Sequence, residues 1–333
     1  MHAIFQANFL EPKRICNEIS ALYGVNIVDE IQACPEAIES LRFFYEKRRA
    51  LHVVAAGSLL EFALQVISSF GVGRIESVFM RPLTLGEFMR ALGHENLHQV
   101  ILGATPKAPL SEVLHNQALN IMRDYMLLGG LPEVISKYLT TQSLLEASET
   151  IEVLRQGYED DFAKYAGKVS TVRLKDTLKA VAQQAGNKFV YSHAYVDANS
   201  AQVHQALSLL EMAGLVIRVL HSSANGIPLG AGIKPSKFKA LIHDVGLFQR
   251  LVGLSPRDFF GEVDYVIQNG CRIIPIEVKA RTRGSMKSLG SFIAEKKSQL
   301  GIRISAENFS YYGNILVVPM YAIEALPSIL EGY

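Results

Sequence analysis

The sequence predicts an α/β protein that begins with a partial parallel sheet, continues as a helical region and ends in a small α/β domain. Three observations lead to this fold class. A strand, a helix and a second strand follow one another with short connections before residue 60. Apolar residues then recur every three or four positions. Near the carboxyl end, two strand-like runs flank Asn269 and Gly270, a pair typical of a tight hairpin turn.

The first segment contains three expected elements. Residues 25–28 form a short strand, residues 34–47 an amphipathic helix, and residues 52–56 a second, buried strand that ends at Gly57 and Ser58. This order, with short connections, favours a parallel pairing of the two strands.

The middle of the chain is expected to be helical from Thr84 to about Tyr165. Apolar side chains follow the helical repeat at Leu114, Ala118, Ile121, Tyr125 and Leu128. Gly129 and Gly130, followed by Pro132, end this helix.

The next part of the chain has the element order of a winged helix. It contains an expected helix at 173–185, a strand at 188–192, a helix at 200–213, a strand at 216–220 and a Gly/Ser/Pro-rich loop at 222–232. Val203, Leu207 and Leu210 lie on one face of the second helix, and Gly214 marks its end.

The hairpin near the carboxyl end groups several charged residues. With Asn269 and Gly270 at the turn, Asp264 is expected to face Pro275 and Glu262 to face Glu277. Alternation then places Glu262, Asp264, Glu277 and Lys279 on one solvent-facing side. Two carboxylates with a lysine are what Mg²⁺-dependent phosphodiester cleavage requires, since the carboxylates hold the metal and the lysine steadies the nucleophile. The alternative is an ordinary polar face of an edge hairpin.

A basic stretch follows this hairpin. Residues 277–303 contain seven basic and two acidic side chains, for a local net charge of +5. Such a flank suits phosphate contacts beside a metal site. A solvated helix face is the alternative, and a single aromatic residue, Phe292, does not suggest base stacking along the stretch.

Asp29 and Glu30 follow the apolar Ile27 and Val28, as acidic residues do at the end of a buried strand. There an aspartate can hold Mg²⁺ through water and a glutamate can polarise an attacking water. This chemistry also needs a glycine-rich loop and a lysine around the phosphates, and the sequence contains no GxxxxGK[ST] run. The alternative is an acidic helix start. The chain by itself is therefore not expected to be a working P-loop ATPase.

His94, Glu95 and His98 fit the HExxH pattern, in which two histidines hold zinc and the glutamate acts as a base. Gly93 stops the preceding helix, and no third ligand is evident in the sequence. A solvated surface helix is therefore the favoured interpretation.

Composition limits the possible partners and compartments. The net charge is +1, so a nucleic acid would have to be attracted by local patches. The three cysteines are far apart and suit a reducing compartment. The first residues resemble no signal peptide, and no apolar run is long enough to span a bilayer. We therefore expect a cytoplasmic protein with no membrane partner.

Sequence blocks in a specific order resemble the prokaryotic AAA-type ATPases that carry a C-terminal domain of unknown function. The resemblance covers nearly the whole chain and rests on Asp29–Pro35, Val53–Leu60, Val72–Arg74, Pro82–Phe88, Gly129–Glu133, Asp160–Tyr165, Lys188–Tyr191, Phe238–Lys239, Asp244–Leu247 and Glu262–Lys279.

The resemblance implies roles for individual residues. Asp29 and Glu30 match the Walker B acids, Ser58 the polar sensor at a strand end, and Arg74 the Gly-Arg of the same module. It also implies a winged-helix-like middle and a PD-(D/E)XK nuclease-like end. There Asp264 and Glu277 would bind Mg²⁺ and Lys279 would be catalytic. The implied division is a truncated ATPase core at 1–90, a helical lid-like region at 91–168, a winged-helix-like module at 169–250 and a remnant nuclease-like domain at 251–333.

Two departures from the family shape the expected function. Only 28 residues precede Asp29, where the family has a strand, a P-loop and a helix. The segment between Asp244 and the hairpin also lacks the family's helical glutamate. We therefore expect a truncated relative that binds DNA or a protein partner and neither binds nor hydrolyses ATP. A Mg²⁺-dependent nuclease and a non-functional gene remnant are the alternatives, and plasmid cleavage lost in Glu277→Ala would identify the nuclease.

Overall fold

The fold is known from a computed structural model. It describes residues 25–28, 31, 35–57, 75–165, 169–194, 199–224, 226–253, 263–269, 272–279, 287–296 and 298–331. Within these ranges no helix is both long and apolar enough to cross a membrane. Asp29, Glu30, Ser58, Arg74 and Glu262 lie outside the described residues.

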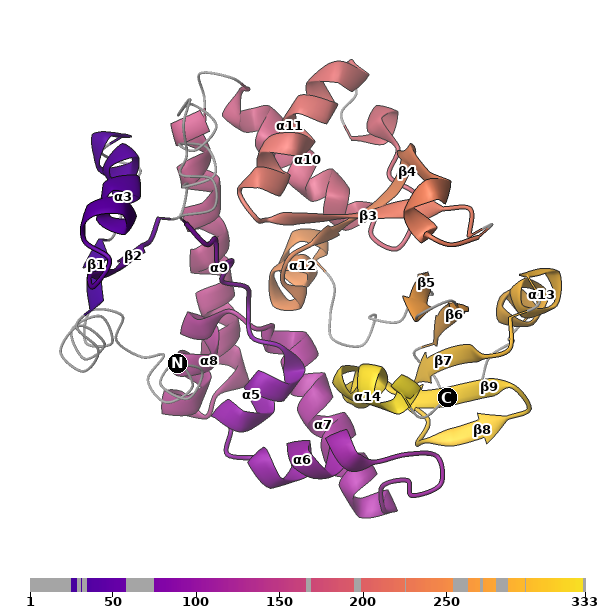
Figure 1. The fold of residues 1–333 in the computed structure, drawn as a ribbon. Helices are drawn as coiled ribbons and strands as arrows, with labels where there is room; N and C mark the ends of the chain where they lie inside the picture. Colours follow the sequence, from indigo (N-terminus) through magenta and orange to yellow (C-terminus); the bar gives the residue numbers. More distant parts are fainter. Residues whose placement is uncertain are drawn as a thin grey trace.

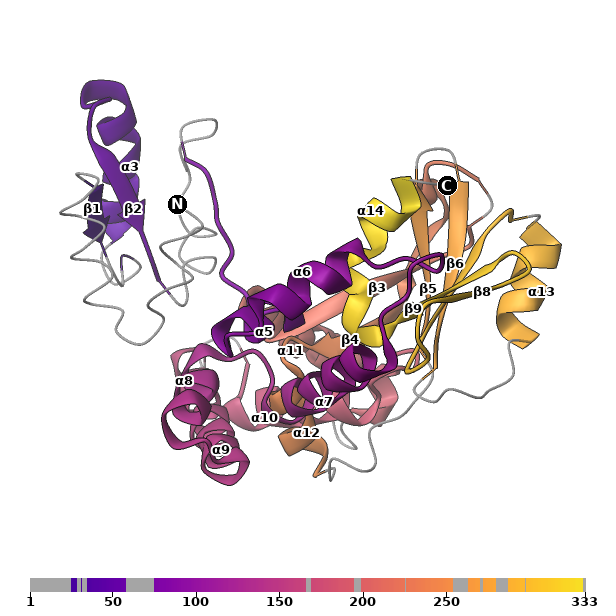
Figure 2. The same ribbon diagram turned by 90° about the horizontal axis from the view of Figure 1, so that it is seen from below.

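The N-terminal unit has the expected strand, helix and strand. These are β1 (Val25–Val28), α3 (Pro35–Lys47) and β2 (His52–Ala55), and the two strands pair in parallel with Val28 beside Ala55. The prediction that β2 is buried was wrong, since Val54 is 50% exposed. Exposed and half-buried residues alternate along β2, which is the pattern of a strand with one open face. In Figures 1 and 2 this unit stands apart from the other elements.

The helical region begins at a capping box. The Thr84 hydroxyl accepts the Glu87 N–H, and the Glu87 carboxylate accepts the Thr84 N–H, so two backbone donors at the helix start are satisfied. Gly129, with a φ of 74°, ends the helix that carries the apolar repeat at Leu114–Leu128. The helices are α5 (Leu85–Ala91), α6 (Glu95–Gly103), α7 (Glu112–Leu128), α8 (Pro132–Thr141), α9 (Leu144–Asp161) and the 3₁₀ turn η2 (Phe162–Tyr165).

The hairpin module consists of two helices and a two-stranded antiparallel hairpin. Its elements are α10 (Thr171–Gln183), α11 (Ser200–Met212), β3 (Val216–Ser222) and β4 (Ile233–Ile242), with the 3₁₀ turn η4 (Leu229–Gly232) in the connecting loop. The strand expected at 188–192 is not formed, and η3 (Tyr191–His193) is a 3₁₀ turn. A backbone hydrogen bond nevertheless joins this segment to β4, from the Phe189 N–H to the Phe238 carbonyl at 2.9 Å.

The carboxyl-terminal part is a five-stranded sheet with the order β5-β6-β7-β9-β8. The β6, β7 and β9 strands are parallel, whereas β5 and β8 are antiparallel edges. The elements are β5 (Val263–Asn269), β6 (Arg272–Lys279), α13 (Lys287–Lys296), β7 (Gly301–Ser305), β8 (Ser310–Tyr312), β9 (Ile315–Pro319), η5 (Met320–Ala325) and α14 (Leu326–Glu331).

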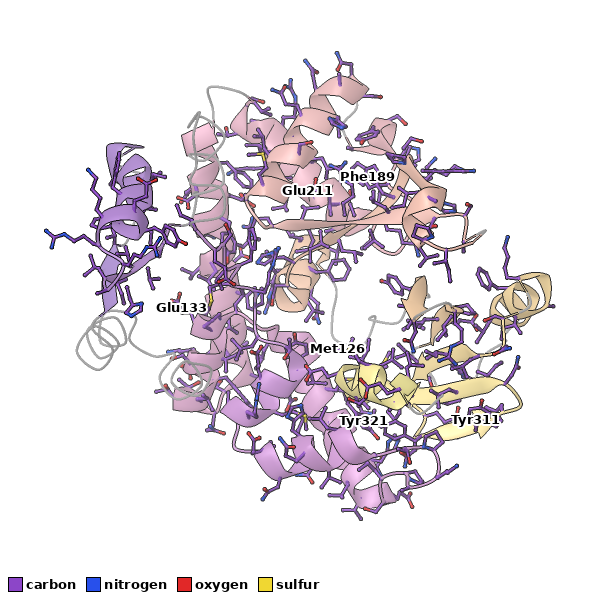
Figure 3. All side chains as sticks on the ribbon, viewed as in Figure 1. Met126, Glu133, Phe189, Glu211, Tyr311 and Tyr321 are labelled. Carbon is purple, nitrogen blue, oxygen red and sulfur yellow. The ribbon has the colours of Figure 1, made fainter. Side chains whose placement is uncertain are left out.

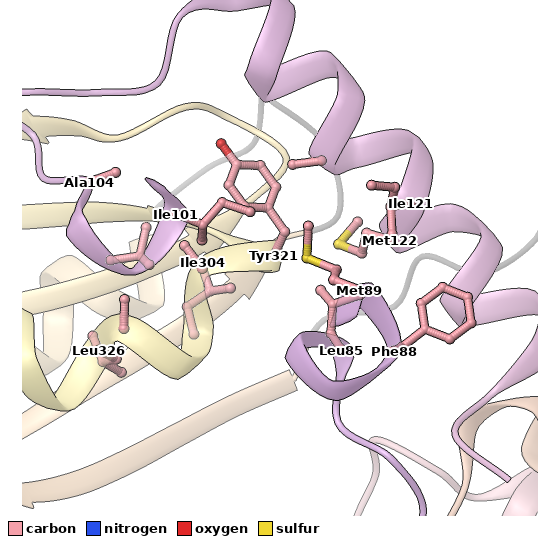
Figure 4. Close-up of a cluster of buried hydrophobic side chains, with 14 of the residues drawn as sticks. Leu85, Phe88, Met89, Ile101, Ala104, Ile121, Met122, Ile304, Tyr321 and Leu326 are labelled. Atoms are coloured by element: carbon pink, nitrogen blue, oxygen red, sulfur yellow. The ribbon is translucent and has the colours of Figure 1, made fainter. Parts of the chain in front are cut away.

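Two hydrophobic cores lie in the described part of the chain that follows residue 82. The first joins the helical region to the carboxyl-terminal sheet, so Phe88 of α5 and Ile304 of β7 belong to one buried cluster (Figure 4). The second lies inside the hairpin module and includes Leu207 of α11 and Phe238 of β4. The divisions at 90, 168 and 250 stay predictions. The first core contains residues from three of the four expected domains, those at 1–90, 91–168 and 251–333.

The helix α12 (Val245–Val252) lies at the boundary of the two cores. It packs against α7 and α9 of the helical region and against α10 of the hairpin module. Figure 1 shows it beneath the β3–β4 hairpin and beside α9.

Candidate functional site

Asp29 and Glu30, the residues expected to carry ATPase chemistry, lie outside the described residues, but residues on both sides of them are described. Ala56, just after β2, donates its N–H to the Val28 carbonyl at 2.9 Å and accepts the Ile31 N–H at 3.1 Å. The residues on either side of Asp29 and Glu30 therefore both bond to Ala56. The roles predicted for Asp29, Glu30, Ser58 and Arg74 stay predictions.

The register of the β5–β6 hairpin differs from the expected one. Asn269 belongs to β5 and pairs with Arg272, so it is not part of the turn. As a result Asp264 lies directly opposite Glu277, rather than opposite Pro275. The shift is by two residues on β6, and an even shift preserves which residues share a face. The backbone positions of the two expected metal ligands are thus neighbours. For Asp264 and Lys279 the structure describes the backbone only.

Glu277 does not face solvent as predicted, because its side chain is only 2% exposed. It lies beside Arg303 in the parallel register of β6 and β7, and Arg303 is 4% exposed. The Arg303 guanidinium lies 4.0 Å from the Glu307 carboxylate. Arg303 therefore does not belong to the exposed basic flank that the sequence predicts.

The helix α13 explains this burial. Gly301 precedes Arg303 by two residues, so the two positions share one face of β7. A Cβ atom added at Gly301 would lie 2.6 Å from Ile293 and 3.2 Å from Leu289, both on α13. The helix thus covers the face that the sequence alone would leave to water. Among the described residues, no group of three or more His, Cys, Asp or Glu side chains is placed to hold a metal ion.

The HExxH residues form a structural contact rather than a surface helix. His98 is buried, and its Nε2 lies 3.2 Å from the Glu324 carboxylate of η5. The same carboxylate accepts the N–H of Gly86 at 3.1 Å. The favoured interpretation of a solvated helix is therefore wrong for His98, because η5 packs on this face of α6. The sequence does not reveal Glu324 as the partner, since it lies 226 residues away.

The hairpin module offers an exposed surface of a different kind. Residues 233–237 of β4 are all exposed and include Lys234 and Lys237. Residues 216–242 contain four basic side chains and no acidic one. The exposed residues of α11, which include His204 and Gln205, are also uncharged. The single described acid on that helix, Glu211, is bonded to Arg218 at 2.7 Å.

Aromatic contacts fix the base of this surface. The rings of Phe189 and Phe238 stack at 5.8 Å, and the Arg218 guanidinium lies 4.8 Å from the Phe238 ring on the same side of the hairpin. Figure 3 places Phe189 and Glu211 on this module. The base of the hairpin is therefore packed by aromatic and cation–π contacts, whereas its tip is exposed.

Two motifs of the sequence meet where α12 begins. One oxygen of Asp244 accepts the Gly130 N–H at 2.7 Å, and the other caps α12 by accepting the Leu247 N–H at 2.8 Å. Asp244 is 3% exposed, and burial raises the pKa of its carboxyl above the usual range. Burial lowers the pKa of the adjacent His243. This contact between two sequence motifs was not anticipated from the sequence.

Comparisons with known proteins agree with part of the resemblance. Residues 3–89 match an AAA domain, residues 119–258 a domain of unknown function (DUF8612), and residues 257–323 another domain of unknown function (DUF4143). Among solved structures, the Walker-type ATPase PABY2304 of Pyrococcus abyssi is 18% identical. That match covers 73% of this chain and 67% of that chain, with a TM-score of 0.42. No curated protein matches. The chain is thus similar to an AAA domain over residues 3–89 and to a DUF4143 domain over residues 257–323.

Proposed function

We propose that this chain is a DNA-binding relative of AAA-type ATPases that does not hydrolyse ATP by itself. The hairpin module, with a winged-helix-like order of elements, is its DNA-binding surface. The observation that carries the proposal is the charge of the hairpin, which has four basic residues and no acidic residue over positions 216–242. Phosphate contacts by lysine and arginine supply most of the affinity for DNA.

The two parts of the surface suit the two kinds of contact that duplex DNA offers. The exposed, uncharged residues of α11 can approach base edges, since a helix of this kind fits the major groove. The lysines near the tip of the hairpin, Lys234 and Lys237, can reach phosphates beside that groove. The near-neutral chain would thus bind DNA through one local basic surface.

The DNA-binding prediction is tested by reversing the charge of the hairpin tip. The double variant Lys234→Glu/Lys237→Glu should bind a fluorescein-labelled duplex about 10- to 100-fold more weakly at low salt. It should also reduce the slope of log affinity against log salt by about two, one for each lost phosphate contact. Fluorescence anisotropy at several salt concentrations measures both quantities.

A matched control changes the net charge equally at another place. Lys107→Glu/Arg123→Glu alters two exposed basic residues of the helical region, near α7 and on it. This variant should keep most of the affinity. If both double variants lose affinity to the same extent, the attraction depends on net charge only, and the hairpin is not the DNA-binding surface.

The ATP prediction concerns the chain by itself. We expect no phosphate release from Mg-ATP and no dissociation constant in the micromolar range, which corresponds to about −8 kcal/mol. The sequence has no glycine-rich loop with a lysine to neutralise the γ-phosphate. Titration calorimetry and a phosphate-release assay measure this. Any residual phosphate release should be unchanged in Glu30→Gln, whereas release that disappears in this variant would contradict the prediction.

A further inference from the structure

The junction where α12 begins connects parts of the chain that lie far apart in the sequence. We call residues 75–83, which lie near the end of the region matched to an AAA domain, the connector. Leu83, at the end of the connector, donates its N–H to the Gly130 carbonyl at 2.7 Å. Gly130 in turn donates to Asp244 at 2.7 Å. The residue before Asp244, His243, donates its N–H to the Leu215 carbonyl at 3.0 Å, at the start of β3. These bonds form a continuous path from the connector to the base of the hairpin.

A second contact follows the same path. A Cβ atom added at Gly214, between α11 and β3, would have Arg81 of the connector as its neighbour, at 3.9 Å from Nη1. The connector thus approaches the hairpin module directly as well as through α7 and α12. Gln249 of α12 adds a further bond, since its side-chain amide donates to the Met126 carbonyl of α7.

The segments of the junction lie so close together at three glycines that a side chain would not fit there. A Cβ atom would lie 2.1 Å from the Leu83 carbonyl oxygen if added at Gly130, and 2.5 Å from the Leu128 carbonyl oxygen if added at Gly246. At Gly129 it would lie 2.3 Å from Asp244. Packed interiors of this density transmit a displacement rather than absorb it. A movement of Leu83 must therefore shift Gly130, and Asp244 bonds Gly130 to the start of α12.

We propose that this junction couples the connector to the hairpin module, so that a change in the AAA-type segment alters the DNA-binding surface. Asp244 is the positioning residue of this device, because its two oxygens bond to two different parts of the molecule. The consequence for DNA rests on the proposed function. The coupling itself does not, and it can be measured without DNA.

The experiment uses hydrogen exchange of the whole chain in the absence of DNA. Asp244→Asn leaves one acceptor oxygen in place of two, so the side chain can no longer accept from both Gly130 and Leu247. The amides of Gly130 and Leu83 on one side, and of His243 and the first residues of β3 on the other, should exchange about tenfold faster. The amides of β7 and β9 should not change.

The matched control is another helix cap. Asn199 caps α11 by accepting the Gln202 N–H at 2.9 Å, which resembles the cap that Asp244 makes on α12. Asn199→Ala should speed exchange within α11 and leave Leu83 unchanged. If Asp244→Asn likewise affects only its own helix, the junction is a simple cap and the coupling is disproved.

A second variant changes the connector end of the path, at an exposed residue. Arg81 is exposed, so Arg81→Ala should leave the protein folded. This variant should change the hydrogen-exchange rates of the amides of His243 and of the residues at the start of β3. Unchanged exchange at both places would overturn the proposed coupling. Loss of DNA binding by the hairpin variants would not bear on this outcome.

Discussion

Replacement of Gly130 by alanine should lower the free energy of unfolding by about 3 kcal/mol, near the upper end for an overpacked core. The added Cβ atom would lie 2.1 Å from the carbonyl oxygen and 2.7 Å from the nitrogen of Leu83. Both are backbone atoms, so no side chain can rotate away to make room. The bond between Leu83 N–H and the Gly130 carbonyl holds the two segments at this distance. Urea denaturation followed by far-UV circular dichroism measures the change.

Gly157→Ala is the matched control for this substitution. Gly157 is exposed within α9, and a Cβ atom added there would meet nothing within 4 Å. Alanine should therefore stabilise the helix by about 0.5–1 kcal/mol, because glycine loses more backbone entropy on folding. A Gly130→Ala protein as stable as the unsubstituted protein would show that the close approach of Leu83 is not a constraint.

Replacement of Ile302 by alanine should lower the free energy of unfolding by about 3–4 kcal/mol, as expected for a large-to-small change in a fully buried position. Ile302 lies in β7 with 0% exposure, within the core shared by the sheet and the helical region. Because the two regions share one core, the amides of α7 should lose protection together with those of β7. Denaturation and hydrogen exchange together measure the size and the extent of the effect.

Ile323→Ala provides the same chemical change at an exposed position. Ile323 is 49% exposed in η5, so its truncation should change the free energy of unfolding by less than about 0.5 kcal/mol. If Ile302→Ala opens the sheet while α7 keeps its full protection, the helical region and the carboxyl-terminal sheet fold as separate units, and the shared core is not cooperative.

Local patterns in the sequence determined most of the individual elements. The helical repeat of apolar residues at Leu114–Leu128 lies within α7, and the helix predicted at 200–213 is α11 to within one residue. Gly129 and Gly214 were predicted from the sequence to end these helices, and both adopt a positive φ. Strand alternation correctly predicted that Asp264 and Glu277 occupy positions on the same face of the β5–β6 hairpin. These features depend on neighbours in the sequence, which is why sequence reasoning could reach them.

Tertiary structure decided the environment of the same residues. Glu277 was expected in water and is buried, because α13 covers its face and Arg303 comes to lie beside it from the next strand. The bond from Gly130 to Asp244 joins residues 114 positions apart, and the contact of His98 with Glu324 spans 226. Burial and partner choice depend on which distant segments pack together. That packing results from the whole set of apolar faces, and no local pattern records it.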